Sequence, residues 1–144
     1  MSYENPWTFE GQVFESEDIG PHFGFVYLIF NKVNGRKYIG RKYFYNIRKQ
    51  PGKSRRVRKE SDWKDYYGSS DELKKDVEEI GKENFRRIIT SLHKTKGDVN
   101  YTEVKEQFLN NVLEDDSFYN ENINGKWHSP PQHIVEGRKV AFDV

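Results

Sequence analysis

The strongest hydrophobic pattern in the chain is an unbroken apolar run over residues 25–30. A continuous run of β-forming residues is typical of a strand buried on both faces, so we expect a central strand here. Asn34-Gly35 follows, and this pair favours a tight type I′ turn because both central positions require φ > 0. Residues 37–40 then return, which predicts an antiparallel hairpin.

The segment after residue 68 has the spacing of an amphipathic helix. Ser69 is followed three residues later by Glu72, which is the pattern of a capping box at a helix N-terminus. Gly81 supplies a C-terminal stop. The apolar residues between them recur at helical intervals: Leu73, Val77 and Ile80.

A third strand and a second helix are expected further along the chain. Apolar residues between positions 85 and 92 indicate the strand: Phe85, Ile88, Ile89 and Leu92. The second helix is predicted from about Tyr101 to Leu113, with Asn100 and Glu103 as its capping box. Its apolar residues cover one broad arc: Val104, Phe108, Leu109, Val112 and Leu113.

The order strand, strand, helix, strand, helix indicates a small α/β fold with a short antiparallel sheet. The chain of 144 residues has the length of one domain. Residues 1–23 are expected to form an N-terminal extension, with a short hairpin turned at Glu10-Gly11. Residues 121–144 are expected to form an irregular C-terminal extension.

Composition excludes several classes of protein. The chain has no cysteine, so it has no disulfide framework, no Cys-ligated zinc and no thiol catalysis. No apolar run approaches the length of a membrane span, and the first residues lack the features of a signal peptide. We therefore expect a soluble cytoplasmic protein without a membrane partner.

The net charge of +1 results from cancellation between distant regions. Residues 41–59 contain nine basic residues and no acidic one, whereas residues 98–121 contain seven acidic residues and one basic residue. A dense basic block commonly tracks phosphates, although a solvated loop is the plainer interpretation. The nine basic residues are Arg41, Lys42, Arg48, Lys49, Lys53, Arg55, Arg56, Arg58 and Lys59.

A pair of short motifs occurs around the predicted hairpin. The first is Gly24-Phe25-Val26-Tyr27, and the second is Tyr38-Ile39-Gly40, whose tyrosine lies eleven residues after Tyr27. This arrangement resembles the GIY-YIG nuclease family, with Phe-Val-Tyr in place of Gly-Ile-Tyr. The resemblance extends over about residues 24–120. It implies a three-stranded antiparallel sheet flanked by helices and the activity of a DNA endonuclease.

The resemblance also implies roles for individual residues. It assigns Tyr27 or Tyr38 to the activation or orientation of water, and Glu106 to the metal. The basic block supplies an arginine for the scissile phosphate, and Arg48 matches the family position best, with Arg55, Arg56 and Arg58 as alternatives. The resemblance also places Tyr66 or Tyr67 as an assisting residue and Asn120 near the site, where we expect it to contact nucleic acid. Independently of the resemblance, Lys42 lies two residues after Gly40 and is expected to help lower the pKa of a motif tyrosine.

Two glutamates of the predicted second helix compete for the role of metal ligand. At 100° per residue from Val104, Glu106 lies at about 200°, on the border of the apolar arc. Glu103 lies at about 260°, further toward solvent, and it already has a capping role. The pattern therefore favours Glu106, because a carboxylate at the margin of a packed face can reach a cleft.

These residue types suit phosphodiester hydrolysis. Mg²⁺ or another divalent cation prefers oxygen ligands and keeps much of its water, so one carboxylate is sufficient to hold it. Arginine stabilises the added charge on the phosphate. A tyrosine titrates near pH 10, so it needs a nearby cation to act as a base at neutral pH.

We therefore interpret the sequence as a metal-dependent DNA endonuclease in which the basic block contacts DNA. A non-catalytic nucleic-acid-binding module on the same fold is the first alternative, and a protein–protein adaptor is the second. A chain of this length leaves no room for a separate DNA-reading domain. Target choice would then depend on the basic block, a homodimer or a separate targeting partner.

Overall fold

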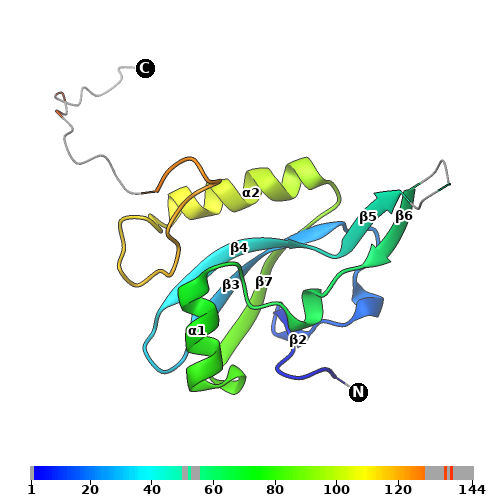
Figure 1. Cartoon of the computed structure of the whole chain (residues 1–144), viewed down its shortest axis with the longest axis horizontal. Helices are drawn as coiled ribbons and strands as arrows, with labels where there is room; N and C mark the ends of the chain where they lie inside the picture. The colour runs from blue at the N-terminus through cyan, green and yellow to red at the C-terminus, as the bar shows by residue number, and fades with distance from the viewer. Residues whose placement is uncertain (1, 50–51, 53–55, 129–134, 136, 138–144) are drawn as a thin grey trace.

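A five-stranded sheet with the order β2-β1-β7-β3-β4 forms the centre of the fold, and α1 and α2 cover its opposite faces (Figure 1). The computed structural model describes residues 2–49, 52, 56–128, 135 and 137, with backbone alone at 48, 49, 56 and 57. The sheet strands are β1 (Thr8–Phe9), β2 (Gln12–Val13), β3 (Gly24–Asn31), β4 (Lys37–Tyr43) and β7 (Phe85–His93). The remaining elements are β5 (Tyr45–Lys49), β6 (Arg56–Glu60), α1 (Asp71–Ile80), α2 (Lys96–Leu109) and three 3-10 turns, η1 (Ser16–Asp18), η2 (Trp63–Asp65) and η3 (Lys82–Asn84).

The predicted antiparallel strands are present, but the prediction of a three-stranded sheet is wrong. Strands β7, β3 and β4 are antiparallel neighbours, and β1 adds to β7 in parallel. The expected hairpin at Glu10-Gly11 is confirmed, since β1 and β2 pair across these two residues and both have positive φ. The segment 1–23 therefore contributes strands to the same sheet. Its pairing with β7 joins positions about 80 residues apart, which no local pattern reveals.

The β3–β4 hairpin is confirmed, with a different turn from the one predicted. Of the two turn residues only Gly35 has positive φ. Asn31 accepts a hydrogen bond from the Gly35 N–H and donates its own N–H to the carbonyl of Arg36. The loop is thus longer than a two-residue type I′ turn, because the pairing already ends at Phe30 and Lys37.

The first helix is close to its prediction and the second is not. The cap of α1 is Ser70 rather than Ser69, and Gly81 ends the helix as expected. Helix α2 begins at Lys96, with Thr95 as its N-cap, and ends at Leu109, so the predicted range 101–113 is wrong at both ends. The buried residues of α2 are Val99, Glu103 and Gln107, whereas Phe108 and Leu109 are exposed.

Most of the described part of the basic block, which we expected to be a loop, forms a two-stranded antiparallel ribbon, while Arg41 and Lys42 belong to β4. Strands β5 and β6 pair from Tyr45 with Glu60 to Lys49 with Arg56, and the ribbon extends away from the sheet (Figure 1). Lys53 and Arg55 lie outside the described residues, as do the side chains of Arg48, Lys49 and Arg56.

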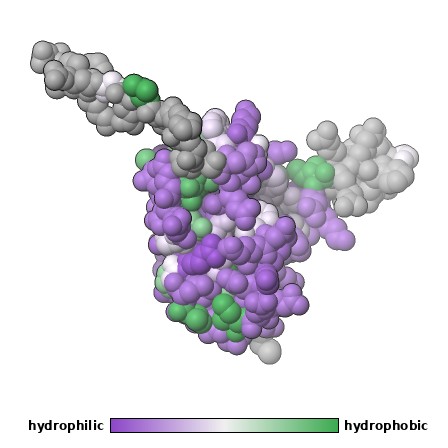
Figure 2. Space-filling model, turned by 60° about the vertical axis from the view of Figure 1, so that its left-hand side comes forward, coloured by the Kyte–Doolittle hydropathy of each residue, from purple (hydrophilic) through white to green (hydrophobic). Residues whose placement is uncertain are grey.

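The core has two layers of different composition. The layer between the sheet and α1 is rich in aromatic residues, with Trp7, Phe25, Phe44 and Trp63 all fully buried. The layer beneath α2 is smaller and mainly aliphatic. The face of the molecule in Figure 2 is mainly hydrophilic, with small separate apolar patches. Neither helix in the described ranges has the length and apolar character needed to cross a membrane.

Trp7 joins the N-terminal segment to this aromatic layer. Its ring packs edge-on against Phe25 and Tyr27 at centroid distances of 5.1 Å, and its indole N–H donates to the Trp63 carbonyl at 2.7 Å. Arg87 is also buried there, 4.8 Å from the Trp7 ring, and donates to the carbonyls of Asn5 and Tyr66. The N-terminal segment therefore supports the tyrosine of the first motif from behind.

We predict that Trp7→Ala lowers the free energy of unfolding by about 3–5 kcal/mol, because it leaves a large cavity in the aromatic layer. Urea unfolding followed by far-UV circular dichroism measures the change. Val33→Ala is the control, since Val33 is 65% exposed and its loss should cost less than about 0.5 kcal/mol. Equal stability of the Trp7→Ala variant and the parent chain would contradict the assigned role of this segment.

Candidate active site

The two motif tyrosines lie side by side because of the β3–β4 register. Tyr27 pairs with Gly40, and Tyr38 is two residues before Gly40 on the same face of β4. Their ring centroids are 6.1 Å apart. Both rings press against Gly40, where a Cβ atom would lie 2.6 Å from Tyr27 Cζ and 2.9 Å from Tyr38 Cε2. The second motif therefore needs glycine so that the Tyr27 ring can cross β4.

Residues from the α1 side hold the outer part of this pair. The Tyr38 hydroxyl shares a hydrogen bond of 2.8 Å with Ser69 Oγ. The Lys42 ammonium forms an ion pair of 2.7 Å with Asp62 and lies 4.2 Å from the centroid of the Tyr66 ring. Lys42 thus contacts the ring of Tyr66, and Asp62 partly neutralises its charge.

An ion pair borders the site on the opposite face of the sheet, where α2 packs. Arg41 points to the α2 side, where its guanidinium is 2.5 Å from the carboxylate of Glu103. Arg41 also donates to the Tyr43 hydroxyl at 3.3 Å, and Tyr43 donates to Asn100 at 2.7 Å. Because β4 is the outermost strand, side chains from both faces reach its open edge.

These groups line one cavity of about 290 Å³ beside β4. It brings together two cationic side chains, one carboxylate and several hydroxyl groups. Its lining residues are Tyr27, Tyr38, Arg41, Lys42, Tyr43, Asn46, Tyr66, Ser69 and Glu103.

Burial keeps both motif tyrosines protonated. Desolvation, together with the neighbouring Tyr38 and Tyr66, raises the pKa of Tyr27 well above its ordinary value of 10. Desolvation also raises the pKa of Tyr38, although its hydrogen bond to Ser69 acts in the opposite direction. The protein surroundings therefore do not lower these pKa values, and at neutral pH both phenols act as neutral hydrogen-bonding groups.

Glu103 is a buried carboxylate that has one charged partner, Arg41, in the part of the chain that the structure describes. Only 9% of its side chain is exposed. Desolvation raises its pKa above the ordinary value, and the attraction of Arg41 opposes this shift. A buried carboxylate with a single partner is poorly solvated, so an added cation would be bound favourably there.

Glu106, the predicted metal ligand, lies elsewhere. It lines a second cavity of about 440 Å³ beneath α2, together with Lys37, Thr90 and Asp115. Among the described residues the two cavities share only Tyr27, whose ring contacts Tyr38 and Tyr66 of the first cavity. The preference for Glu106 is therefore not supported by the geometry, because α2 begins five residues earlier than predicted and turns Glu103 inward.

Asn120 supports the site from behind rather than facing it. Its side chain is buried, accepts from the Ile39 N–H at 3.1 Å and donates to the Ile39 carbonyl at 2.8 Å. Gln107 donates to the same carbonyl at 2.9 Å. The expected contact of Asn120 with nucleic acid is thus not supported, and the residue fixes the backbone of the second motif.

The arginine in the described site is Arg41, while the side chain of the predicted Arg48 lies outside the described residues. The sequence pattern favoured Glu106 over Glu103 and assigned Ser69 only to a helix cap, whereas both Glu103 and Ser69 line the cavity. One signal could have identified Glu103, since Thr95 and Asp98 form an N-terminal capping pattern upstream of the one chosen. A helix that starts there directs Glu103 to the same face as Val99.

The comparisons with known proteins agree with this geometry. A family model described as "Putative endonuclease segE, GIY-YIG domain" matches residues 7–123. No curated protein and no solved structure matches the chain. The matched range includes β1 and β2, the segment that contributes Trp7 to the core.

We predict that Gly40→Ala lowers the free energy of unfolding by about 1–3 kcal/mol, since the new methyl group forces the Tyr27 ring out of place. Gly97→Ala is the matched control. Gly97 lies in α2 with nothing within 4 Å of an added Cβ, so the change should be neutral or stabilise by up to about 1 kcal/mol. Thermal unfolding of both variants measures the difference, and equal effects would contradict the tight crossing of Tyr27 over β4.

We also predict a loss of stability in alkali. An unfolded tyrosine loses its proton near pH 10, whereas the raised pKa of Tyr27 keeps its proton in the folded state. Its contribution to stability is therefore fully present below about pH 10 and is lost as the pH rises further. The urea midpoint should fall less between pH 9 and 11 in Tyr27→Phe than in the parent chain. Tyr101→Phe, at a site 68% exposed, should behave like the parent.

Proposed function

We propose that this chain, which belongs to the GIY-YIG nuclease family, is an endonuclease that hydrolyses phosphodiester bonds of duplex DNA with the help of a divalent metal ion. The observation that carries the proposal is the cavity beside β4, where the two motif tyrosines meet two cationic side chains and one carboxylate. Hydrolysis of a phosphodiester needs positive charge at the phosphate, a site for a metal ion and groups that hold a water molecule. The side chains of the cavity are of the types that these three tasks require, which supports the proposal.

Arg41 is the side chain that we assign to the scissile phosphate. Burial opposes its charge, but Glu103 and Tyr43 together raise its pKa above the ordinary value, so it is always cationic. A guanidinium can bind two phosphate oxygens at once, which fixes the orientation of the phosphate. Lys42, on the next position of β4, adds a second positive charge.

Tyr27 and Tyr38 are assigned to the water molecule that attacks the phosphorus. As neutral phenols they can each accept one hydrogen bond from water and donate another. The Ser69 hydroxyl fixes the direction of the Tyr38 hydroxyl, and the packing over Gly40 fixes that of Tyr27. Both tyrosines therefore orient the nucleophile, and its proton passes to a group that is unprotonated at neutral pH, namely a phosphate oxygen of the substrate or solvent water.

The donor chemistry of the cavity fits a hard divalent cation such as Mg²⁺, because Glu103 supplies a carboxylate beside hydroxyl oxygens. Within the described residues no three His, Asp or Glu side chains cluster as a metal site, so Glu103 would hold the ion with water and phosphate oxygens. When bound, Mg²⁺ would polarise the phosphate and stabilise the charge of the transition state.

The Arg41–Glu103 ion pair links the two binding events. While the pair is intact, the Glu103 carboxylate is neutralised by Arg41 and is a weaker ligand for a cation. A phosphate that binds Arg41 weakens this attraction and makes Glu103 available. The substrate and the metal ion therefore bind cooperatively in this proposal.

We predict that Glu103→Gln reduces Mg²⁺-dependent nicking of supercoiled plasmid by about 100-fold or more, because the metal ligand is lost. Glu106→Gln is the matched control on the same helix, one turn further on, and should retain activity within a few fold. Agarose gels of time courses with Mg²⁺ and with EDTA measure both variants.

Circular dichroism and duplex binding establish that both variants are folded. If Glu106→Gln is the inactive one, the metal assignment moves to the cavity beneath α2. If the parent chain binds duplex DNA but does not cleave it with Mg²⁺ or Mn²⁺, the chain is a non-catalytic binding module and the proposed activity is wrong.

A further inference from the structure

The two faces of the β5–β6 ribbon differ in what lies beneath them. Directly paired residues of an antiparallel ribbon share one face, and neighbours along a strand alternate. Asn46 pairs with Lys59, so these residues share a face, and Asn46 lines the candidate active site. Ile47 pairs with Arg58 on the opposite face. Arg58 and Lys59 are both exposed and adjacent in the sequence, yet they lie on opposite faces of the ribbon.

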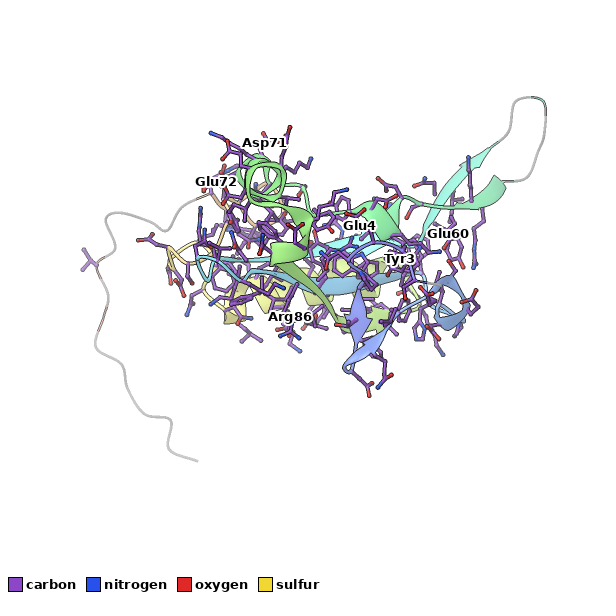
Figure 3. The ribbon with its side chains drawn as sticks, turned by 90° about the horizontal axis from the view of Figure 1, so that it is seen from below. Tyr3, Glu4, Glu60, Asp71, Glu72 and Arg86 are labelled. Atoms are coloured by element: carbon purple, nitrogen blue, oxygen red, sulfur yellow. The ribbon has the colours of Figure 1, made fainter. Side chains whose placement is uncertain are left out.

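The Arg58 face is already occupied by intramolecular contacts. The Arg58 guanidinium stacks on the Tyr45 ring, 3.6 Å from its centroid. Glu60, on the same face at the base of the ribbon (Figure 3), accepts hydrogen bonds from Ser16 at 2.7 Å and from the Trp63 indole at 2.8 Å. Its charge faces the segment that carries the exposed acid Glu17. At the base of the ribbon a phosphate approaching this face would meet the Glu60 carboxylate, while the register puts Lys49 and Arg56 on this face at the far end.

The Lys59 face continues into cationic surface instead. Asn46 joins it to the cavity that holds Arg41 and Lys42. An exposed amide and an exposed ammonium thus extend the line of donors from the cavity outward along the ribbon. All of these groups can donate hydrogen bonds to phosphate oxygens.

We propose that the Asn46–Lys59 face of the ribbon is a one-sided guide for the duplex, along which the DNA backbone runs outward from the active site while the Arg58 face points away from it. This inference rests on the proposed function, since it assumes that the phosphate in the cavity belongs to DNA. A five-residue strand spans about 16 Å at about 3.3 Å per residue. Because duplex DNA rises about 3.4 Å per base pair, the guide covers about five base pairs beyond the scissile phosphate.

The test compares Lys59→Ala with Arg58→Ala, which remove the same charge from adjacent exposed positions. Binding of a fluorescent 30-base-pair duplex is measured by anisotropy without Mg²⁺ over a series of salt concentrations. Lys59→Ala should weaken binding by about three- to tenfold and reduce the slope of log K against log salt by about 0.9, the value for one phosphate contact. Arg58→Ala should stay within about twofold of the parent, with an unchanged slope.

A second pair tests the same faces by adding charge. Asn46→Asp should weaken binding more strongly than Ile47→Asp, although both add one carboxylate to an exposed position of β5. Circular dichroism and urea unfolding verify that the four variants fold.

Three outcomes would overturn the guide. They are equal losses in Lys59→Ala and Arg58→Ala, a loss in Arg58→Ala alone, and no loss in either. Plasmid nicking by the parent chain is measured separately, so that cleavage with any of these outcomes rejects the guide while the proposed function stands. Absence of both cleavage and duplex binding rejects the proposed function and the guide together.

Discussion

The passage of the Tyr27 side chain over Gly40 is the contact on which the arrangement of the site depends. Tyr27 belongs to the central strand β3, yet its hydroxyl reaches the open edge of the sheet because the neighbouring strand has no Cβ at that point. Trp7 packs behind the same ring and keeps it in place. The aromatic core and the candidate active site are therefore continuous, and loosening one is expected to misalign the other.

Helix α2 buries polar side chains against the sheet at positions that are usually apolar. Its inward positions include Glu103 and Gln107, while Phe108 and Leu109 face outward. Gln107 and Asn120 both form hydrogen bonds with the backbone of Ile39. These polar side chains therefore attach α2 and the segment after it to β4, a role that apolar side chains usually have. This design positions a carboxylate next to Arg41, at the cost of burying a charge that only one partner compensates.

The sequence predicted correctly those elements that local residue patterns determine, and it failed for those whose residues are placed by the site or by distant contacts. The β3–β4 hairpin and the end of α1 at Gly81 follow from an apolar run and a helix stop, both of which are local. The inward face of α2 could not be recognised, because the hydrophobic arc does not identify the buried side of a helix that buries Glu103. The parallel pairing of β1 with β7 is equally hidden, since it is decided by packing between distant segments.

The segment that follows α2 divides the outer edge of β4 into two parts. Residues 117–120 cover the first part, since Lys37 bonds to Ser117 and Tyr119 through the backbone and Asn120 occupies both polar groups of Ile39. An uncovered edge strand invites another chain to extend the sheet by strand addition, which is a common route to aggregation. This fold blocks that route along half of β4 and leaves only the stretch beside Arg41 accessible. The covered half is thus closed to another β-strand, and the uncovered half is the part that borders the candidate active site.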